Sequence, residues 1–176
     1  MSRAAAIGLI LAPLLAGCHG TPALPDASPT MTLESASFAA GQPIPAKYGA
    51  DGGNVSPELH WSAPPAGTKA FTLVVEDPDA PGGSPFIHWV VYNIPATANA
   101  FPESQPADGA LVGQNDAGTT GYFGPKPPSG THHYHFRIYA LDKASELQAG
   151  ASAGQVIGEM SGHQLGMGEL VGTFTH

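Results

Sequence analysis

The sequence predicts a mainly β domain with antiparallel sheets, and three observations support this fold class. Gly and Pro contribute 23 and 18 residues, a proportion typical of β proteins with many turns and long loops. The apolar runs are as short as strands, and segments rich in Gly and Pro separate them. Few helices lie between these runs to act as crossovers, which favours antiparallel pairing. The 176 residues, 42% of them hydrophobic, suit one domain after a short N-terminal segment is set aside.

The N-terminal segment has the features of a bacterial export signal with a lipid attachment site. Residues 1–18 (MSRAAAIGLILAPLLAGC) carry one basic residue, Arg3, before an apolar stretch shorter than the roughly 20 residues of a membrane span. The ending at 15–18 (LAGC) resembles the lipobox of bacterial lipoproteins, in which the cysteine is lipidated and becomes the first residue. Cys18 is the only cysteine, so lipidation would consume the one thiol, and no intramolecular disulfide can form. The alternative is an ordinary secretory signal with an incidental cysteine.

The segment after the lipobox predicts a tether and a destination. Residues 19–30 (HGTPALPDASPT) contain three prolines and no apolar periodicity, which is typical of a flexible linker. The residue after the cysteine is His19, not the aspartate that resembles an inner-membrane retention signal. In a Gram-negative host this favours an outer-membrane anchor facing the periplasm. The folded domain is expected at residues 31–176, and it would touch the membrane only through the N-terminal lipid.

Strand-forming residues dominate the domain. The runs Phe71–Val75 and His88–Ile94 are apolar and β-branched, and His133–Leu141 alternates apolar with polar residues. Shorter strands are expected at Thr32–Phe38 and at Leu170–Thr175. The segments between these strands are long loops rich in Pro and Gly, chiefly at 77–85, 102–120 and 124–130.

One helix is expected near the C-terminus. Ser152 and Gln155 have the spacing of a capping box, and apolar residues follow with helical spacing at 156, 157 and 160. Gly158 and Gly162 weaken this prediction, because glycine is a poor helix former. A shorter turn is expected at Lys143–Gln148.

The charge of the chain argues against nucleic-acid binding. The net charge is −8, and only 11% of the residues are charged. Nucleic-acid binding depends on Lys and Arg side chains that neutralise phosphates. The basic residues of the domain are few and dispersed: Lys47, Lys69, Lys126, Arg137 and Lys143. Neither nucleic acid nor an anionic membrane surface is therefore an expected partner of the domain itself.

Polar residues concentrate in two segments, 76–81 (EDPDAP) and 124–136 (GPKPPSGTHHYHF). The second segment holds a run of histidines, which strand alternation divides between two faces. His132, Tyr134 and Phe136 are expected on one face, and His133, His135 and Arg137 on the other. The histidine run is therefore not one cluster, and His133 and His135 are expected on the outer face rather than at a ligand.

These segments resemble the two signature regions of the phosphatidylethanolamine-binding protein family, and the bacterial Raf-kinase-inhibitor-like branch is the most similar. The similarity runs from about Met31 to His176, nearly the whole expected mature chain. The stretches that carry it are 77–81 (DPDAP), 88–94 (HWVVYNI), 124–136, 54–57 (NVSP) and 162–165 (GHQL).

The resemblance implies a large antiparallel sheet, a second smaller sheet, a C-terminal helix and a small surface pocket for phosphate-like or other anionic groups. Carried over by position, the pocket is expected to use Asp77, Pro81, His88, Pro128, Gly130, His132 and Tyr134. The expected function is binding of a small anion such as phosphate or a phospholipid headgroup, with no cofactor and no metal. The bacterial branch is not known as a lipid carrier, so the family name is not taken as the function.

The residue types are also consistent with an anion site. Histidines with a pKa near 6.5 can be charged or can act as neutral N–H donors, and Tyr134 adds a hydroxyl donor. Backbone N–H groups of the loop 124–130 can turn inward. Asp77 is expected to accept the proton of His88 or His132, which would orient that ring and favour its charged form.

Other interpretations remain open at this stage. Asp77 and Asp79 could cap turns, and His88 and His132 could be core histidines. An aspartate with two or three histidines can hold zinc, although the spacing resembles no compact zinc motif. A weak hydrolase could use a histidine with Asp77, but the chain lacks Gly-x-Ser-x-Gly and a free cysteine nucleophile. A protein partner, inhibited or regulated through the exposed loops, is the main competing function, and the oligomeric state stays open.

Overall fold

The structure is a computed structural model, and it describes residues 21–176. A large sheet has the strand order β6-β4-β3-β7-β8, and every pairing between its strands is antiparallel. Its strands are β3 (Ala70–Asp77), β4 (Phe86–Pro95), β6 (Leu111–Val112), β7 (Thr131–Leu141) and β8 (Gln164–Thr175). The predicted signal segment, Cys18 and the start of the tether lie outside the described residues. Within 21–176, no helix is long and apolar enough to cross a membrane.

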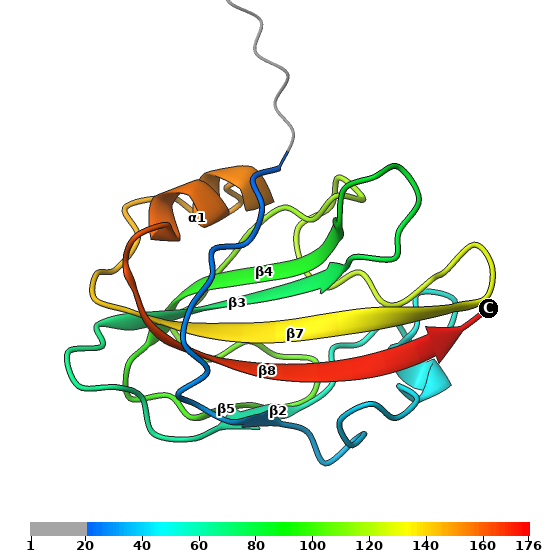
Figure 1. Ribbon diagram of the computed structural model, residues 1–176, viewed down its shortest axis with the longest axis horizontal. Helices are drawn as coiled ribbons and strands as arrows, with labels where there is room; N and C mark the ends of the chain where they lie inside the picture. The colour runs from blue at the N-terminus through cyan, green and yellow to red at the C-terminus, as the bar shows by residue number, and fades with distance from the viewer. Residues whose placement is uncertain (1–20) are drawn as a thin grey trace, which may run out of the picture.

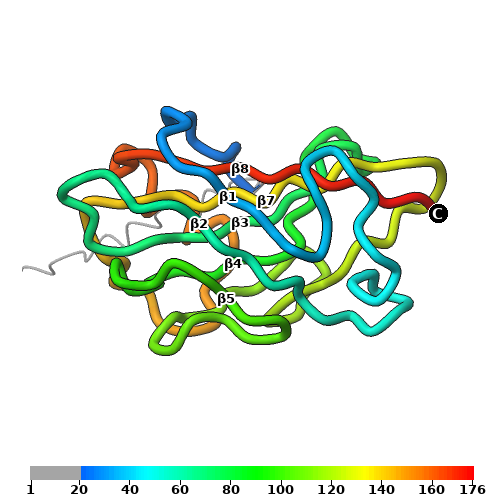
Figure 2. The backbone as a smooth tube through the Cα atoms, turned by 90° about the horizontal axis from the view of Figure 1, so that it is seen from below, coloured from blue at the N-terminus to red at the C-terminus, as the bar shows by residue number. Residues whose placement is uncertain are grey.

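A small sheet and one α-helix cover opposite faces of the large sheet. The small sheet has the order β1-β2-β5, and its pairs are also antiparallel (Figure 2). Its strands are β1 (Leu33–Glu34), β2 (Leu59–Trp61) and β5 (Ala100–Phe101). The helices are the 3-10 helix η1 (Ala46–Tyr48) and the α-helix α1 (Ala153–Met160). The predicted mainly β fold, with a larger and a smaller sheet and a C-terminal helix, is confirmed (Figure 1).

The position of β3 in the sheet explains why its apolar run shows no alternation between apolar and polar residues. It lies in the middle of the large sheet, and all of its residues are buried. Phe71, Leu73 and Val75 belong to the core shared with the small sheet, whereas Val74 belongs to the core beneath α1. A strand covered on both faces needs apolar residues at nearly every position.

The helix begins where the capping box predicts. The Ser152 side chain accepts the Gln155 N–H, and the Gln155 side chain accepts the Ser152 N–H. The buried residues of α1 share one face: Ala153, Val156, Ile157 and Met160. Gly158 is tolerated because it lies on the exposed face.

Strand β8 is longer than predicted, because it begins at Gln164 and not at Leu170. Its glycines hide the strand pattern in the sequence, but each is required by close packing. A Cβ on Gly166 would lie 2.0 Å from Thr30 Oγ1, and one on Gly172 would lie 2.6 Å from the Ile44 side chain. The strand is therefore rich in glycine because neighbouring segments cross it closely.

Two other predicted elements are wrong in extent. In the predicted strand Thr32–Phe38 only β1 forms, because the Glu58 side chain binds the N–H groups of Ala36 and Ser37 in place of a neighbouring strand. No regular turn forms at Lys143–Gln148. Here the Asn93 side chain bonds both the N–H and the C=O of Ser145, at 2.7 and 2.9 Å, and fixes the position of the segment.

The described part of the predicted tether, residues 21–30, lies against the domain. Leu24 and Ala27 pack against the core beneath α1. The Met167 N–H donates to the Ser28 carbonyl at 3.0 Å, and Figure 1 shows this segment crossing the large sheet beside α1.

Candidate functional site

A pocket of about 460 Å³ opens at the end of the large sheet where the C-terminus lies (Figure 1). The end of β3, the start of β4, the start of β7 and three loops contribute to its wall. The lining residues are Asp51, Asp77, Ala80, Pro81, Phe86, His88, Ala117, Phe123, Lys126, Pro127, Pro128, His132 and His176. The two segments that the sequence analysis singled out therefore meet in one cavity.

Asp77 and His132 form a buried pair in this pocket. Asp77 ends β3 and His132 is the second residue of β7, the strand that pairs with β3. The His132 Nδ1 lies 2.7 Å from Asp77 Oδ2, and Asp77 Oδ1 accepts the Asp79 N–H at 2.9 Å. Because a carboxylate only accepts, Nδ1 carries the proton, and Nε2 is the ring nitrogen left for a ligand. Of the two partners expected for Asp77, the structure selects His132.

His88 is held by the backbone rather than by Asp77. Its Nδ1 donates to the Phe123 carbonyl at 2.7 Å, and the Phe123 N–H donates to the His88 carbonyl at 3.0 Å. Burial lowers the pKa of His88, although the Phe123 carbonyl and the charges of Asp77 and Asp116 oppose this shift. His88 is thus neutral at pH 7, and its Nε2 then presents a lone pair.

Two residues predicted for the pocket do not line it. Tyr134 is fully buried behind His88, with its ring edge-on to the imidazole at 5.1 Å between centroids. Burial raises the pKa of Tyr134, and its hydroxyl has no hydrogen-bond partner among residues 21–176. Gly130 lies in the loop before β7 with a φ of 68°, and its carbonyl accepts the His176 N–H at 3.0 Å.

The other predicted residues, Asp77, Pro81, His88, Pro128 and His132, all line the cavity. The lining residues that were not predicted from the sequence include Phe86, Phe123, Lys126, Asp51 and His176. Phe86 was detectable, because it lies two residues before His88 in the same strand and so on the same face. Asp51 and His176 come from distant parts of the chain, and no local pattern connects them to the pocket.

The loop that carries Phe123 and Lys126 rests on the loop after η1. The Gly124 N–H donates to Asn54 Oδ1 at 2.8 Å, and the Ala50 N–H donates to the Pro125 carbonyl at 3.0 Å. A Cβ on Gly124 would lie 2.2 Å from the Tyr48 carbonyl oxygen, so the two loops touch backbone to backbone. The pocket wall is therefore positioned by a segment that does not itself reach the ligand space, apart from Asp51.

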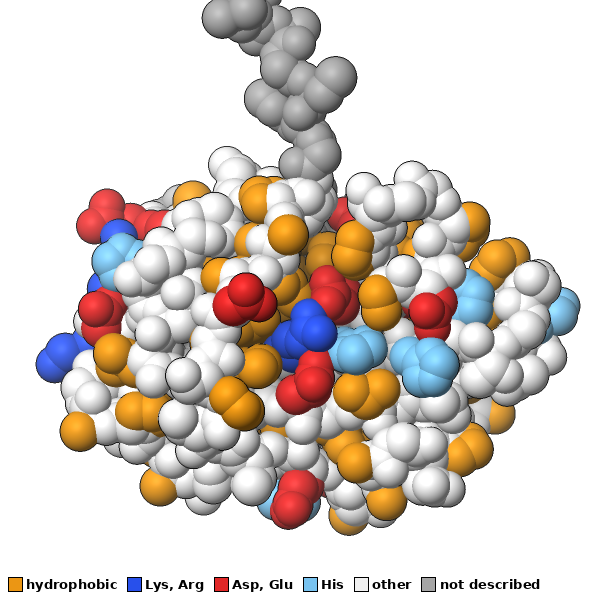
Figure 3. Space-filling model, viewed as in Figure 1, with side chains coloured by type: hydrophobic (Ala, Val, Ile, Leu, Met, Phe, Trp, Pro, Cys, Tyr) orange, Lys and Arg blue, Asp and Glu red, His pale blue; other side chains and the backbone are white. Residues whose placement is uncertain are grey.

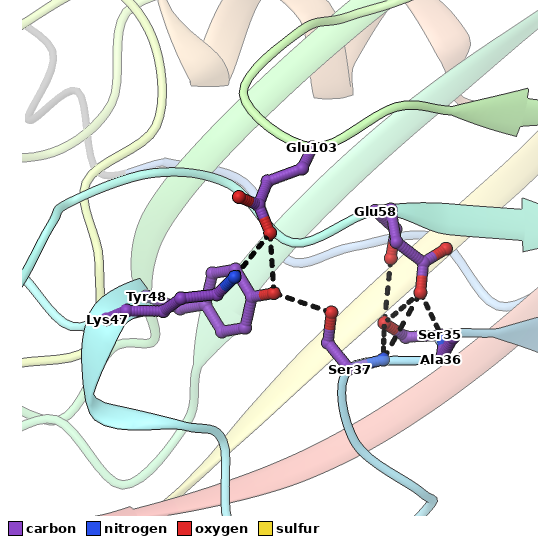
Figure 4. A network of polar contacts seen from close by, with 7 residues as sticks. All are labelled: Ser35, Ala36, Ser37, Lys47, Tyr48, Glu58 and Glu103. Atoms are coloured by element: carbon purple, nitrogen blue, oxygen red, sulfur yellow. Dashed lines mark hydrogen bonds and ion pairs between the residues drawn. The ribbon is translucent and has the colours of Figure 1, made fainter.

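Tyr48 connects this support to the small sheet (Figure 4). Its hydroxyl donates to Glu103 at 2.8 Å and lies 2.6 Å from the Ser37 hydroxyl, while Lys47 binds the same Glu103 oxygen at 2.7 Å. Hydrogen bonds from Lys47 and Tyr48 lower the pKa of Glu103. The network holds η1 against the segments that flank β1 and follow β5.

The remaining histidines of β7 lie on the opposite face from the pocket. His133 donates through both its backbone N–H and Nδ1 to Asp79 Oδ2, at 2.8 and 2.7 Å. His135 and Arg137 bind Glu169, and Arg137 also binds Glu76. Figure 3 shows histidine, basic (Lys or Arg) and acidic side chains gathered on this face. The predicted division of the histidine run is confirmed, and no group of three or more metal-ligating side chains occurs among residues 21–176.

The chain is similar to known proteins over most of its length. The family model described as phosphatidylethanolamine-binding protein matches residues 34–175. A UPF0098 protein of Methanothermobacter thermautotrophicus is 43% identical over 149 residues, which cover 82% of this chain and 98% of that protein. A Mycobacterium tuberculosis protein named "Putative lipoprotein LppC" is 45% identical over 157 residues, which cover 88% of this chain and 76% of that protein.

Solved structures show the same fold. Escherichia coli YbcL, described as a member of the mammalian PEBP family, superposes with a TM-score of 0.79 at 32% identity, covering 83% of this chain and 98% of that one. A PEBP homolog from Chlamydia trachomatis has a TM-score of 0.78 at 38% identity, covering 85% of this chain and 99% of that one. By its sheets and by these likenesses, the chain belongs to the phosphatidylethanolamine-binding protein family.

Proposed function

We propose that the pocket binds a small anion, phosphate-like or carboxylate, through Nε2 of His88 and of His132. The observation that carries this proposal is that both rings make the same kind of hydrogen bond and leave the same atom free. Each Nδ1 is already engaged as a donor, to the Phe123 carbonyl or to Asp77 Oδ2, at 2.7 Å in both cases. Both rings line the same cavity, so each has an Nε2 atom available for a ligand.

The positive charge that an anion requires would come from the histidines. Lys126 lines the pocket, but its Nζ lies 2.6 Å from Asp51, so this cation is already paired. A proton on Nε2 of His88 or His132 turns a lone pair into an N–H donor, and charge-assisted hydrogen bonds are the stronger kind. Binding therefore draws protons into the pocket, and affinity falls as the pH rises.

A hydrolytic role has less support. Asp77 and His132 have the geometry of an orienting carboxylate and a base. However, the pocket lining within residues 21–176 contains no serine, threonine or cysteine that could act as a nucleophile. The arrangement is better suited to holding a ligand than to cleaving one.

Calorimetric titration of the full chain in a non-ionic detergent tests the proposal, with phosphate and acetate between pH 5.5 and 8. We expect binding that weakens with rising pH, and losses of about tenfold or more in His88→Ala and His132→Ala, since each removes a charged hydrogen bond. His133→Ala is the matched control, because His133 neighbours His132 in sequence but lies on the outer face. No binding at millimolar concentration would contradict the proposal and favour a protein partner.

We also propose that Cys18 carries a lipid that anchors the domain at the cell envelope, in a Gram-negative host at the outer membrane facing the periplasm. The lipobox-like ending at 15–18 supports this, as does the lipoprotein name of the Mycobacterium tuberculosis relative. Metabolic labelling with an alkyne fatty acid should mark the wild type and not Cys18→Ser. Labelling of both proteins, or of neither, would contradict the anchor. Separation of the membranes on a density gradient tests the destination.

A further inference from the structure

The pocket is larger and more apolar than a bare inorganic anion requires. Its volume of about 460 Å³ lies within the range of about 300–1,000 Å³ typical of sites for organic ligands. Away from the two histidines, the wall is largely built from aromatic and proline side chains: Phe86, Phe123, Pro81, Pro127 and Pro128. A phosphate or acetate ion between the histidines would leave these side chains uncovered.

Phe86 and Phe123 form one aromatic cluster with His88. The centroids of Phe86 and Phe123 lie 4.8 and 5.7 Å from that of His88, and 6.1 Å from each other. The Phe123 ring is nearly parallel to the imidazole, at 21°. Most other phenylalanines of the domain are buried in the core, whereas these two are partly exposed where they line the cavity. They therefore offer ring surface beside the proposed anion position.

The aspartates of the pocket are already paired within the protein, so they do not favour a positive charge on the ligand. Asp77 is bound by His132, and Asp51 is bound by Lys126. Neither of these side-chain carboxylates is therefore free to bind an ammonium group. The part of the ligand that lies beyond the acid group is best matched by an uncharged apolar surface.

From these contacts we infer that the natural ligand is a small organic anion with a flat, uncharged aryl body. The acid group lies between His88 and His132, and the ring packs against Phe86 and Phe123. This inference rests on the proposed anion-binding function and adds the chemical class of the ligand. Aromatic rings prefer offset or edge-to-face contact with other rings, which gives an aryl body an advantage over an alkyl body of equal size.

Paired ligands that differ only in the ring test the inference: phosphate against phenyl phosphate, and acetate against benzoate. Titration of the full chain in non-ionic detergent at pH 6 should show each aryl acid binding about tenfold or more tightly than its partner. Phe86→Leu and Phe123→Leu keep an apolar side chain but remove the ring. In both variants we expect the ratio of phenyl phosphate affinity to phosphate affinity to shrink to about twofold or threefold. A cooperative thermal unfolding transition shows that each variant has folded.

The outcomes separate this inference from the proposed function. Equal affinity for phosphate and phenyl phosphate would overturn the aryl ligand and leave anion binding intact. Cyclohexyl phosphate binding as tightly as phenyl phosphate would also overturn it, because burial of any apolar group would then suffice. Phosphoethanolamine or phosphocholine binding more tightly than phenyl phosphate would show that the ligand carries a positive charge instead. If none of these ligands bound, the proposed function would itself be wrong.

Discussion

At the scale of single residues, His88 links burial, protonation and the ligand. Burial lowers its pKa in the folded protein, while the unfolded chain keeps the usual value near 6.5. Protonation therefore favours the unfolded chain. The stability associated with a neutral His88 is complete above pH 6.5 and is lost as the pH falls from there toward the folded-state pKa. A bound anion opposes this loss, because it stabilises the protonated ring.

His88→Gln should remove this part of the pH dependence. Thermal unfolding of the wild type and the variant between pH 5 and 8 should give stability curves whose difference changes as the pH falls below about 6.5. Saturating phosphate should raise the melting temperature of the wild type most at the acid end. Parallel curves for His88→Gln would contradict the assignment.

Asp77→Asn tests the orienting role of Asp77. An amide bonds the His132 Nδ1–H more weakly than a carboxylate does, and it also weakens the bond to the Asp79 N–H. We expect a loss of about 1–3 kcal/mol in unfolding free energy and about tenfold in phosphate affinity. Nitrogen NMR of the imidazole should show a mixture of tautomers in the variant. Unchanged affinity with a single tautomer would rule out the orienting role.

At the scale of elements, the loop after η1 positions the pocket wall through backbone contacts. Gly124→Ala would push a methyl group to 2.2 Å from the Tyr48 carbonyl oxygen and to 2.7 Å from the Ala50 nitrogen. These are backbone atoms, so the loops must separate. We expect a loss of about 2–4 kcal/mol in urea unfolding, together with weakened phosphate binding. Wild-type affinity in this variant would show that the wall does not need this support.

Gly158→Ala is the opposite case within α1. A Cβ at Gly158 meets nothing within 4 Å, and the position lies on the exposed face of the helix. Alanine is favoured over glycine in a helix interior by about 0.8–1.0 kcal/mol. Urea unfolding should show a gain of roughly this size without any change in phosphate affinity. A loss of stability would mean that the α1 backbone differs from the one described.

At the scale of the whole molecule, residues 21–30 test where the domain begins. Leu24 and Ala27 pack on the core beneath α1, and Ser28 bonds Met167 of β8. Deletion of 21–30 should lower the unfolding free energy by about 1–3 kcal/mol, from lost apolar burial and hydrogen bonds. Replacement by a Gly/Ser segment of equal length should have the same effect. No loss in either variant would support the flexible tether expected from the sequence.

Much of the fold and part of the site follow from patterns that are local in the chain. Alternation along β7 predicts that His132 faces inward and His133 outward, and the spacing of Ser152 and Gln155 predicts the start of α1. These properties depend on neighbours within a few residues, so the sequence contains them directly. The strands β1 and β8 were predicted with the wrong extent, because contacts from distant segments decide where both begin or end.

By itself, the sequence determined the β class, the faces of the main strands, the helix and the two segments that carry the pocket. Only the tertiary structure decided that Asp77 pairs with His132 and not with His88, because this depends on which strands are neighbours. It also decided that Phe123 and His176 share the pocket wall while Tyr134 lies behind it. Local periodicity shows which way a side chain points along its own strand. Which side chains it meets depends on strand order and loop contacts, which join residues far apart in the chain.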